Sequence, residues 1–146
     1  YRRKLMVLQV YLLRTGSIGN RDAETLINTL VEPKRSLLGD LRRELISLGF
    51  SEETGFDAIN IESFVSYSFS GSTRFIFKHK WNLVVVLIIY SEAEKELIVR
   101  KFPKISNFAF ARNEEDGTIW TELDPKTDRE LILQLANRFL LPEEKK

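Results

Sequence analysis

The residues best suited to bind a charged ligand are cations that recur on one face of a predicted helix and one face of a predicted strand. Arg35 and Arg42 are seven positions apart, which places them on the same side of a helix. Arg74, Lys78 and Lys80 alternate with apolar or aromatic neighbours, so they lie on one side of a strand. Rows of this kind bind phosphate oxygens, with an affinity that falls as salt rises. The predicted contact residues are Lys34, Arg35, Arg42, Arg43, Arg74, Lys78 and Lys80.

An alternative is that these cations belong to an ordinary solvated surface. Asp40 and Glu44 stand at helical spacing from Arg43 or its neighbours and would neutralise them within the chain. The whole sequence of 146 residues carries 22 basic and 21 acidic side chains, a formal net charge of +1. That balance excludes binding of a polyanion by overall charge alone. Residues 1–50 are nevertheless basic, with nine Lys or Arg and five Asp or Glu.

Acidic residues offer a second kind of chemistry. Asp116 followed by Asp124-Pro125-Lys126 superficially fits a nuclease that holds magnesium between two carboxylates and activates water beside a lysine. Pro125 cannot donate a hydrogen bond within a central strand, and this segment is instead typical of a helix start. The Glu114–Gly117 group is explained by a solvated turn. Metal-dependent hydrolysis is therefore a remote alternative.

Composition excludes several other chemistries. The chain has no cysteine, which excludes disulfides, thiolate metal sites and a cysteine nucleophile, and its single histidine is His79. No phosphate-binding glycine loop is present among the seven glycines. Phe108-Ala109-Phe110 resembles the base-stacking aromatic pair of RNA-recognition motifs, but the basic and glycine residues that should precede it are missing. We expect no enzyme activity, no metal and no cofactor.

Apolar periodicity predicts the helices that position these residues. A first helix is predicted over residues 2–14, and a second contains Ala23, Leu26, Ile27, Leu30 and Val31 on one face with Asn20 as N-cap. Pro33 interrupts the pattern, and a third helix follows over residues 36–48, ended by Gly49. A last helix is predicted to begin at either Asp124 or Thr127 and to end before Pro142.

Residues after position 50 predict mostly strands. Segments 56–68 and 73–81 form a hairpin around Ser70-Gly71-Ser72, and 83–90 is a central strand buried on both faces. Segment 91–102 is a helix or a strand, with Ser91 and Glu94 favouring the helix. Segments 104–112 and 118–123 form a second hairpin. The predicted class is α+β: an N-terminal three-helix unit, a β-rich middle and a strand-helix-hairpin-helix ending.

The order of three helices followed by a hairpin resembles winged-helix domains over residues 4 to 80. In that family the third helix enters the major groove and the hairpin touches the flanking backbone, so the resemblance implies binding of duplex DNA. The expected units are 1–80 and 81–146, or one single domain. The function expected is a non-enzymatic binding or regulatory module. The alternative is a protein-protein interaction or adaptor domain that docks or self-associates through the aromatic 63–81 hairpin.

The first residues of the chain, basic and then apolar, resemble a secretory signal peptide. Arg14 closes the apolar run and no small-residue cleavage site follows, which favours a buried helix. The apolar run 83–89 is far shorter than the ~20 residues that span a bilayer. We therefore expect no membrane partner and a cytoplasmic location.

Overall fold

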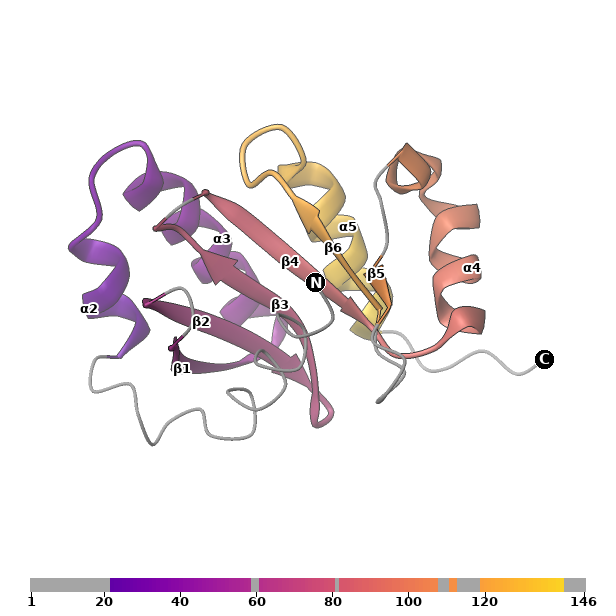
Figure 1. The fold of residues 1–146 in the computed structure, drawn as a ribbon, viewed down its shortest axis with the longest axis horizontal. Helices are drawn as coiled ribbons and strands as arrows, with labels where there is room; N and C mark the ends of the chain where they lie inside the picture. The colour runs from indigo at the N-terminus through magenta and orange to yellow at the C-terminus, as the bar shows by residue number, and fades with distance from the viewer. Residues whose placement is uncertain (1–21, 59–60, 81, 108–110, 113–118, 141–146) are drawn as a thin grey trace.

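A six-stranded antiparallel sheet is the framework of the chain, with strand order β1-β2-β3-β4-β6-β5 (Figure 1). The computed structural model describes residues 22–58, 61–80, 82–107, 111–112 and 119–140. The strands are β1 Ser51–Asp57, β2 Glu62–Phe69, β3 Ser72–Lys78, β4 Val84–Ile89, β5 Ala111–Arg112 and β6 Ile119–Leu123. The helices are α2 Ala23–Asn28, α3 Lys34–Leu48, α4 Glu92–Lys101, the 3-10 helix η1 Pro103–Asn107 and α5 Arg129–Leu140. The predicted α+β class is confirmed.

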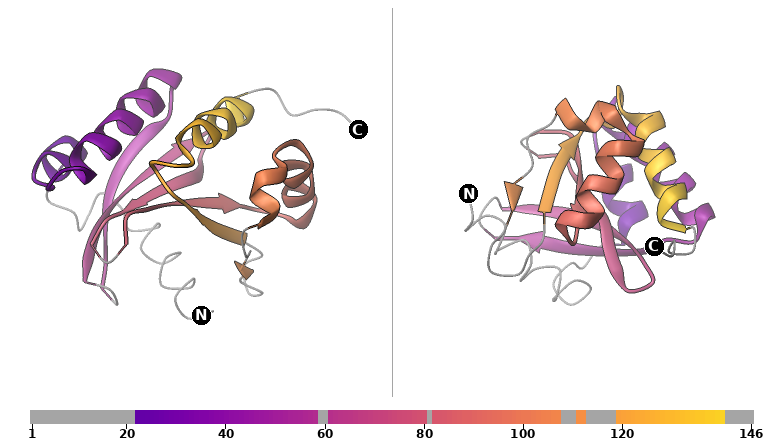
Figure 2. Two further views of the ribbon diagram at one scale, coloured as in Figure 1. Left: turned by 90° about the horizontal axis from the view of Figure 1, so that it is seen from above. Right: turned by 90° about the vertical axis from the view of Figure 1, so that its right-hand side faces the viewer.

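The main core lies between the sheet and helices on one of its sides. Seen from above, α2, α3 and α5 lie on the same side of the sheet, whereas α4 stands at its far end (Figure 2). Alternate strand residues such as Tyr67, Phe75 and Leu87 pack there against Leu41 of α3 and Ile132 of α5. The near-complete burial of this cluster removes apolar area from water, and this stabilises the fold.

A second, smaller apolar cluster uses the alternate residues of the same strands. Its buried members belong to four strands: Phe64, Ile76, Val86, Ile88 and Trp120. Because successive strand residues point to opposite faces, these side chains lie on the side of the sheet away from α3 and α5. Strand β4 is therefore buried on both faces, as its continuous apolar run predicts.

Helix α3 follows from its sequence pattern and its ends. Its buried face consists of Leu38, Leu41 and Leu45, at helical spacing. Gly49 ends it in the left-handed region with φ of 107°, which confirms the predicted stop. The preceding helix α2 is capped by Asp22, whose Oδ1 accepts a hydrogen bond from the Thr25 amide.

Three further expectations meet different outcomes. The predicted helix over 91–102 is confirmed as α4, with the Ser91 hydroxyl accepting from the Glu94 amide as N-cap. The last helix begins at Arg129, after both predicted starts, because Asp124 and the following residues form a turn that precedes it. Where one long strand 104–112 is expected, the chain forms η1 and the two-residue β5.

The hairpin β2–β3 differs from the wing that the winged-helix resemblance implies. Its turn at Ser70 and Gly71 is as predicted, with positive φ at both residues. However, β2 pairs with β1 on its outer side, and β3 pairs with β4. Strand β1 is absent from the prediction because segment 51–57 is rich in polar residues. The pairing makes β2 and β3 interior strands that join residues of both predicted units into one sheet, not a projecting ribbon.

Some expectations concern residues outside the described part of the chain. These are the first helix over 2–14, Asn20, Phe108 to Phe110, and Asp116. Within the described ranges, no helix combines the length and apolar character needed to cross a bilayer.

Candidate functional site

The predicted contact residue Arg42 is engaged inside the molecule. Its guanidinium donates to both carboxylate oxygens of Glu52, at 2.8 and 3.2 Å. Tyr67 donates its phenolic hydrogen to the same carboxylate at 2.7 Å. Burial raises the pKa of Tyr67, and the hydrogen bond to Glu52 and its negative charge raise it further, while Arg42 lowers it. These three groups tie α3 to β1 and β2.

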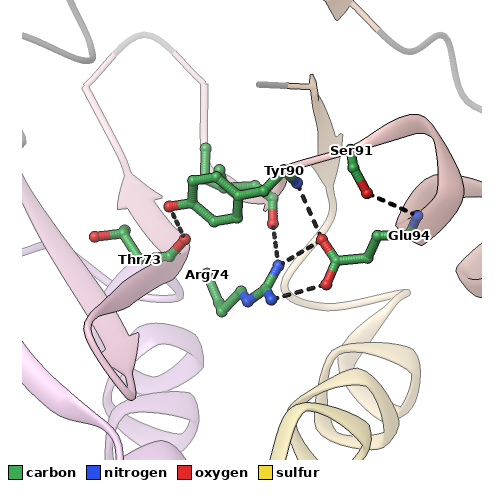
Figure 3. A network of polar contacts seen from close by, with 6 residues as sticks. Thr73, Arg74, Tyr90, Ser91 and Glu94 are labelled. Carbon is green, nitrogen blue, oxygen red and sulfur yellow. Dashed lines mark hydrogen bonds and ion pairs between the residues drawn. The ribbon is translucent and has the colours of Figure 1, made fainter. Parts of the chain in front are cut away.

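Arg74 forms a second internal network (Figure 3). It donates two parallel hydrogen bonds to Glu94, at 2.8 and 2.9 Å, and one to the Ile88 carbonyl at 3.2 Å. Its guanidinium lies 4.2 Å from the ring centroid of Phe139 and 5.1 Å from that of Tyr90. Arg74 thus connects β3, α4 and α5, and its planar charged group is directed inward.

Lys78 lies in a third network, between two buried carboxylates at the end of the sheet. Its Nζ is 2.9 Å from Asp57 Oδ2 and 3.8 Å from Glu62 Oε1. The two acids face each other in the register of β1 and β2, immediately before and after their connecting turn. One ammonium compensates two buried carboxylates here. Removing the ammonium would leave both buried charges without their partner.

The backbone after Lys78 is fixed by the same network. Glu62 Oε2 accepts hydrogen bonds from the amides of His79 and Lys80, at 2.6 and 2.9 Å. Lys34, at the start of α3, donates from Nζ to the His79 carbonyl at 2.6 Å. Lys80 donates from Nζ to the carbonyl of Ile61 at 2.8 Å. This end of the sheet is therefore linked to both adjacent turns.

The remaining two predicted contact residues form short-range surface pairs. Arg35 pairs with Glu32 at 3.2 Å, three residues earlier. Arg43 pairs with Asp40, also at helical spacing, as the sequence indicates. Both pairs are substantially exposed and contribute little to folding.

The seven cations do not gather on one surface. Lys34, Lys78 and Lys80 lie at the end of the sheet where β3 finishes. At the opposite end, Arg42 binds Glu52 near the start of β1, and Arg74 lies near the start of β3. Ion pairs with carboxylates of the described residues are formed by Arg35, Arg42, Arg43, Arg74 and Lys78.

The acidic residues considered for metal chemistry have other roles where they are described. Asp124 Oδ1 accepts from the amides of Lys126 and Thr127, at 2.7 and 3.2 Å, in a turn. Asp128 is buried, accepts from the Asp124 amide and lies 3.2 Å from Lys104 Nζ. Among the described residues, no group of three or more His, Asp or Glu is arranged to hold a metal ion.

Two exposed apolar side chains, which the sequence did not predict, lie in turns at the end of the sheet near Lys34. Val31 is 77% exposed and Ile61 63% exposed, the highest values among large apolar side chains in the described ranges. Val31 lies in the turn before α3, and its carbonyl accepts from the Lys34 amide. Ile61 lies in the β1–β2 turn, where Lys80 holds its carbonyl. We call Val31, Lys34, Ile61 and Lys80 the turn-end surface.

Both turns border the same edge of the molecule. β1 and β3 end, and β2 and β4 begin, at the left of Figure 1, where α2 and the turn before α3 also lie. Ile61 adopts φ of 52°, a conformation that β-branched residues rarely take. Sequence reasoning placed Val31 on a buried helical face and Ile61 inside a strand, so neither was considered for binding.

Comparisons with known proteins add no relative. No protein-family model, no curated protein and no solved structure matches this chain.

Proposed function

We propose that this chain acts by binding a protein partner through the turn-end surface. The observation that carries the proposal is the exposure of Val31 and Ile61 at one end of the sheet. Covering an exposed aliphatic side chain of this size with a partner gains about 1.5–3 kcal/mol. Single exposed apolar residues are common on proteins, but here each of two turns at the same end of the sheet exposes one.

The backbone of Ile61 supports a role beyond folding. A left-handed conformation at a β-branched residue costs on the order of 1–3 kcal/mol, and the side chain repays little of this because it is exposed. Asn or Gly would fit the same backbone with less strain. An isoleucine at this position is therefore better explained by a contact with another molecule.

Charge at the surface indicates the chemistry of the partner. Among the described residues, no carboxylate lies within ion-pair distance of Lys34, and its ammonium binds a backbone carbonyl. A carboxylate from outside can approach this cation without displacing an internal acid. We therefore propose a partner segment that combines aliphatic side chains with acidic ones.

Binding of duplex DNA by a winged-helix mode is the competing proposal. Phosphates would have to compete with Glu52 for Arg42 and with Glu94 for Arg74, two mostly buried pairs. Removing one partner of such a pair costs several kcal/mol of stability. The internal pairing of these cations supports the protein-binding proposal over the DNA-binding one.

A selection from a random peptide display library tests the proposal. Wild-type protein should enrich peptides that contain aliphatic and acidic residues, and Val31→Asp or Ile61→Asp should each weaken their binding at least tenfold. Ile46→Asp is the matched control, because Ile46 is 39% exposed near the other end of α3 and should leave binding unchanged.

The DNA alternative is measured on the same protein. Fluorescence anisotropy with a mixed-sequence duplex at about 50 and 200 mM salt detects phosphate-driven binding, which weakens steeply between the two. Salt-sensitive DNA binding together with peptide binding unaffected by Val31→Asp and Ile61→Asp would overturn the proposal. Enriched peptides that bind all three variants equally would overturn it as well.

A further inference from the structure

His79 occupies the junction between the turn-end surface and the buried acids of the sheet. Its backbone amide donates to Glu62 and its carbonyl accepts from Lys34, both at 2.6 Å. The residue thus joins β2 to the start of α3 through its main chain. Anything that moves His79 also moves the carbonyl to which Lys34 binds.

The surroundings of the His79 imidazole disfavour its protonated form. Its Nε2 is buried and has no hydrogen-bond partner among the described residues. A protonated ring would carry an N–H at that atom, and a buried donor without an acceptor is costly. The Lys34 ammonium binds the carbonyl of His79 itself, and this positive charge would repel a protonated imidazole.

The charged groups around the ring act in both directions. Burial lowers the pKa of His79; the Glu62 carboxylate raises it, Lys34 lowers it, and a backbone hydrogen bond with Ser63 raises it. Glu62 is already occupied by two amides and faces Lys78, which also neutralises Asp57. The outcome is a pKa below the ordinary value for histidine, so the ring is neutral near pH 7.

We infer that His79 is a proton-sensitive latch for the turn-end surface: protonation of its ring loosens the contact between Lys34 and the His79 carbonyl. The start of α3 then separates from the end of β3, and Val31 and Ile61 lose their relative placement. That consequence for binding rests on the proposed function, whereas the latch itself is a property of the isolated chain.

NMR titration of the isolated protein tests the latch without a partner. Since His79 is the only histidine, one imidazole signal reports its protonation. We expect its midpoint below about 6.5, the ordinary value. The amide signals of Lys34, Arg35 and Lys80 should shift with the same midpoint.

Two variants separate the latch from a general effect of acid. In His79→Gln the shifts of Lys34 and Arg35 over this pH range should disappear. In Lys34→Gln the His79 midpoint should rise, because a repelling cation is gone. Shifts at the start of α3 that persist in His79→Gln, or that are missing while His79 titrates in the wild type, would overturn the latch.

Binding measurements distinguish failure of the latch from failure of the proposed function. A peptide enriched by the display selection is titrated at pH 7.5 and 5.5 against wild type and His79→Gln. Binding that needs Val31 and Ile61 but weakens equally in both proteins refutes the latch alone. Coupled NMR shifts together with binding insensitive to Val31→Asp refute the proposed function alone.

Discussion

The guanidinium of Arg74 and the carboxylate of Glu94 meet in two parallel hydrogen bonds, at 2.8 and 2.9 Å, across the gap between β3 and α4 (Figure 3). Glu94 Oε1 also accepts from the Tyr90 amide at 3.0 Å, just before the helix begins. Tyr90 in turn donates its hydroxyl to the Thr73 carbonyl at 2.8 Å. The Arg74–Glu94 pair therefore fixes the position at which the chain leaves β4 and enters α4.

Replacing Arg74 with lysine should destabilise the protein by about 2 kcal/mol, although the charge is retained. Lysine cannot reproduce the planar two-point contact with Glu94 or stack on Phe139. Urea unfolding followed by circular dichroism gives the free energy of unfolding. Arg43→Lys is the control, since its partner Asp40 is on the surface, and it should change stability by less than about 0.5 kcal/mol. Equal effects of the two variants would show that the Arg74 network does not hold α4.

Tyr67 should make the protein less stable at alkaline pH. Burial and the hydrogen bond to Glu52 raise its pKa in the folded state, whereas the unfolded chain loses the phenolic proton near pH ~10. Stability conferred by the protonated phenol is complete below that pH and falls as the pH rises above it.

Comparing the unfolding free energy of wild type and Tyr67→Phe between pH 8 and 11 measures this contribution. The wild-type curve should fall more steeply above pH ~10. Absorbance near 295 nm should show no ionisation of Tyr67 in the folded protein. Parallel curves for the two proteins would contradict the shift.

Sequence patterns predicted the elements whose stability comes from one apolar face. The spacing of Leu38, Leu41 and Leu45 identified α3, and the run from Val84 to Ile89 identified β4. Strand β1 was missed because Ser51–Asp57 has few apolar residues. It exists through pairing with β2 and through side chains such as Glu52, which binds Arg42 of α3.

Whether the sequence predicts the ion pair of a cation depends on how far along the chain its partner lies. Arg43 pairs with Asp40 three residues away, a contact that helical spacing indicates. Arg74 pairs twenty residues away and Lys78 twenty-one, across the sheet. Local spacing carries no information about such contacts. Val31 was misplaced because helical periodicity continued beyond Asn28, where α2 ends.

Ile61→Asn should stabilise the protein by about 1 kcal/mol while weakening the binding proposed for the turn-end surface. Asparagine tolerates the left-handed backbone better than a β-branched residue, and little buried apolar area is lost. Thermal unfolding and peptide titration on the same sample measure the two effects. A variant that is more stable and binds the selected peptides as wild type would assign Ile61 no role in binding.

Lys78→Met should be the most damaging of the substitutions considered, with a loss of about 3–5 kcal/mol. The aliphatic part of the side chain is replaced, but Asp57 and Glu62 lose the ammonium that lies 2.9 and 3.8 Å from their oxygens. Two buried like charges then face each other without the cation between them, and their repulsion destabilises the fold.

The double variant Lys78→Met/Asp57→Asn separates charge from packing. Because it removes one negative charge along with the cation, it should recover at least half of the lost stability. Chemical unfolding of both variants at pH 7.5 supplies the comparison. If Asp57→Asn restores nothing, the lysine acts through packing, and the ionic network does not hold this end of the sheet together.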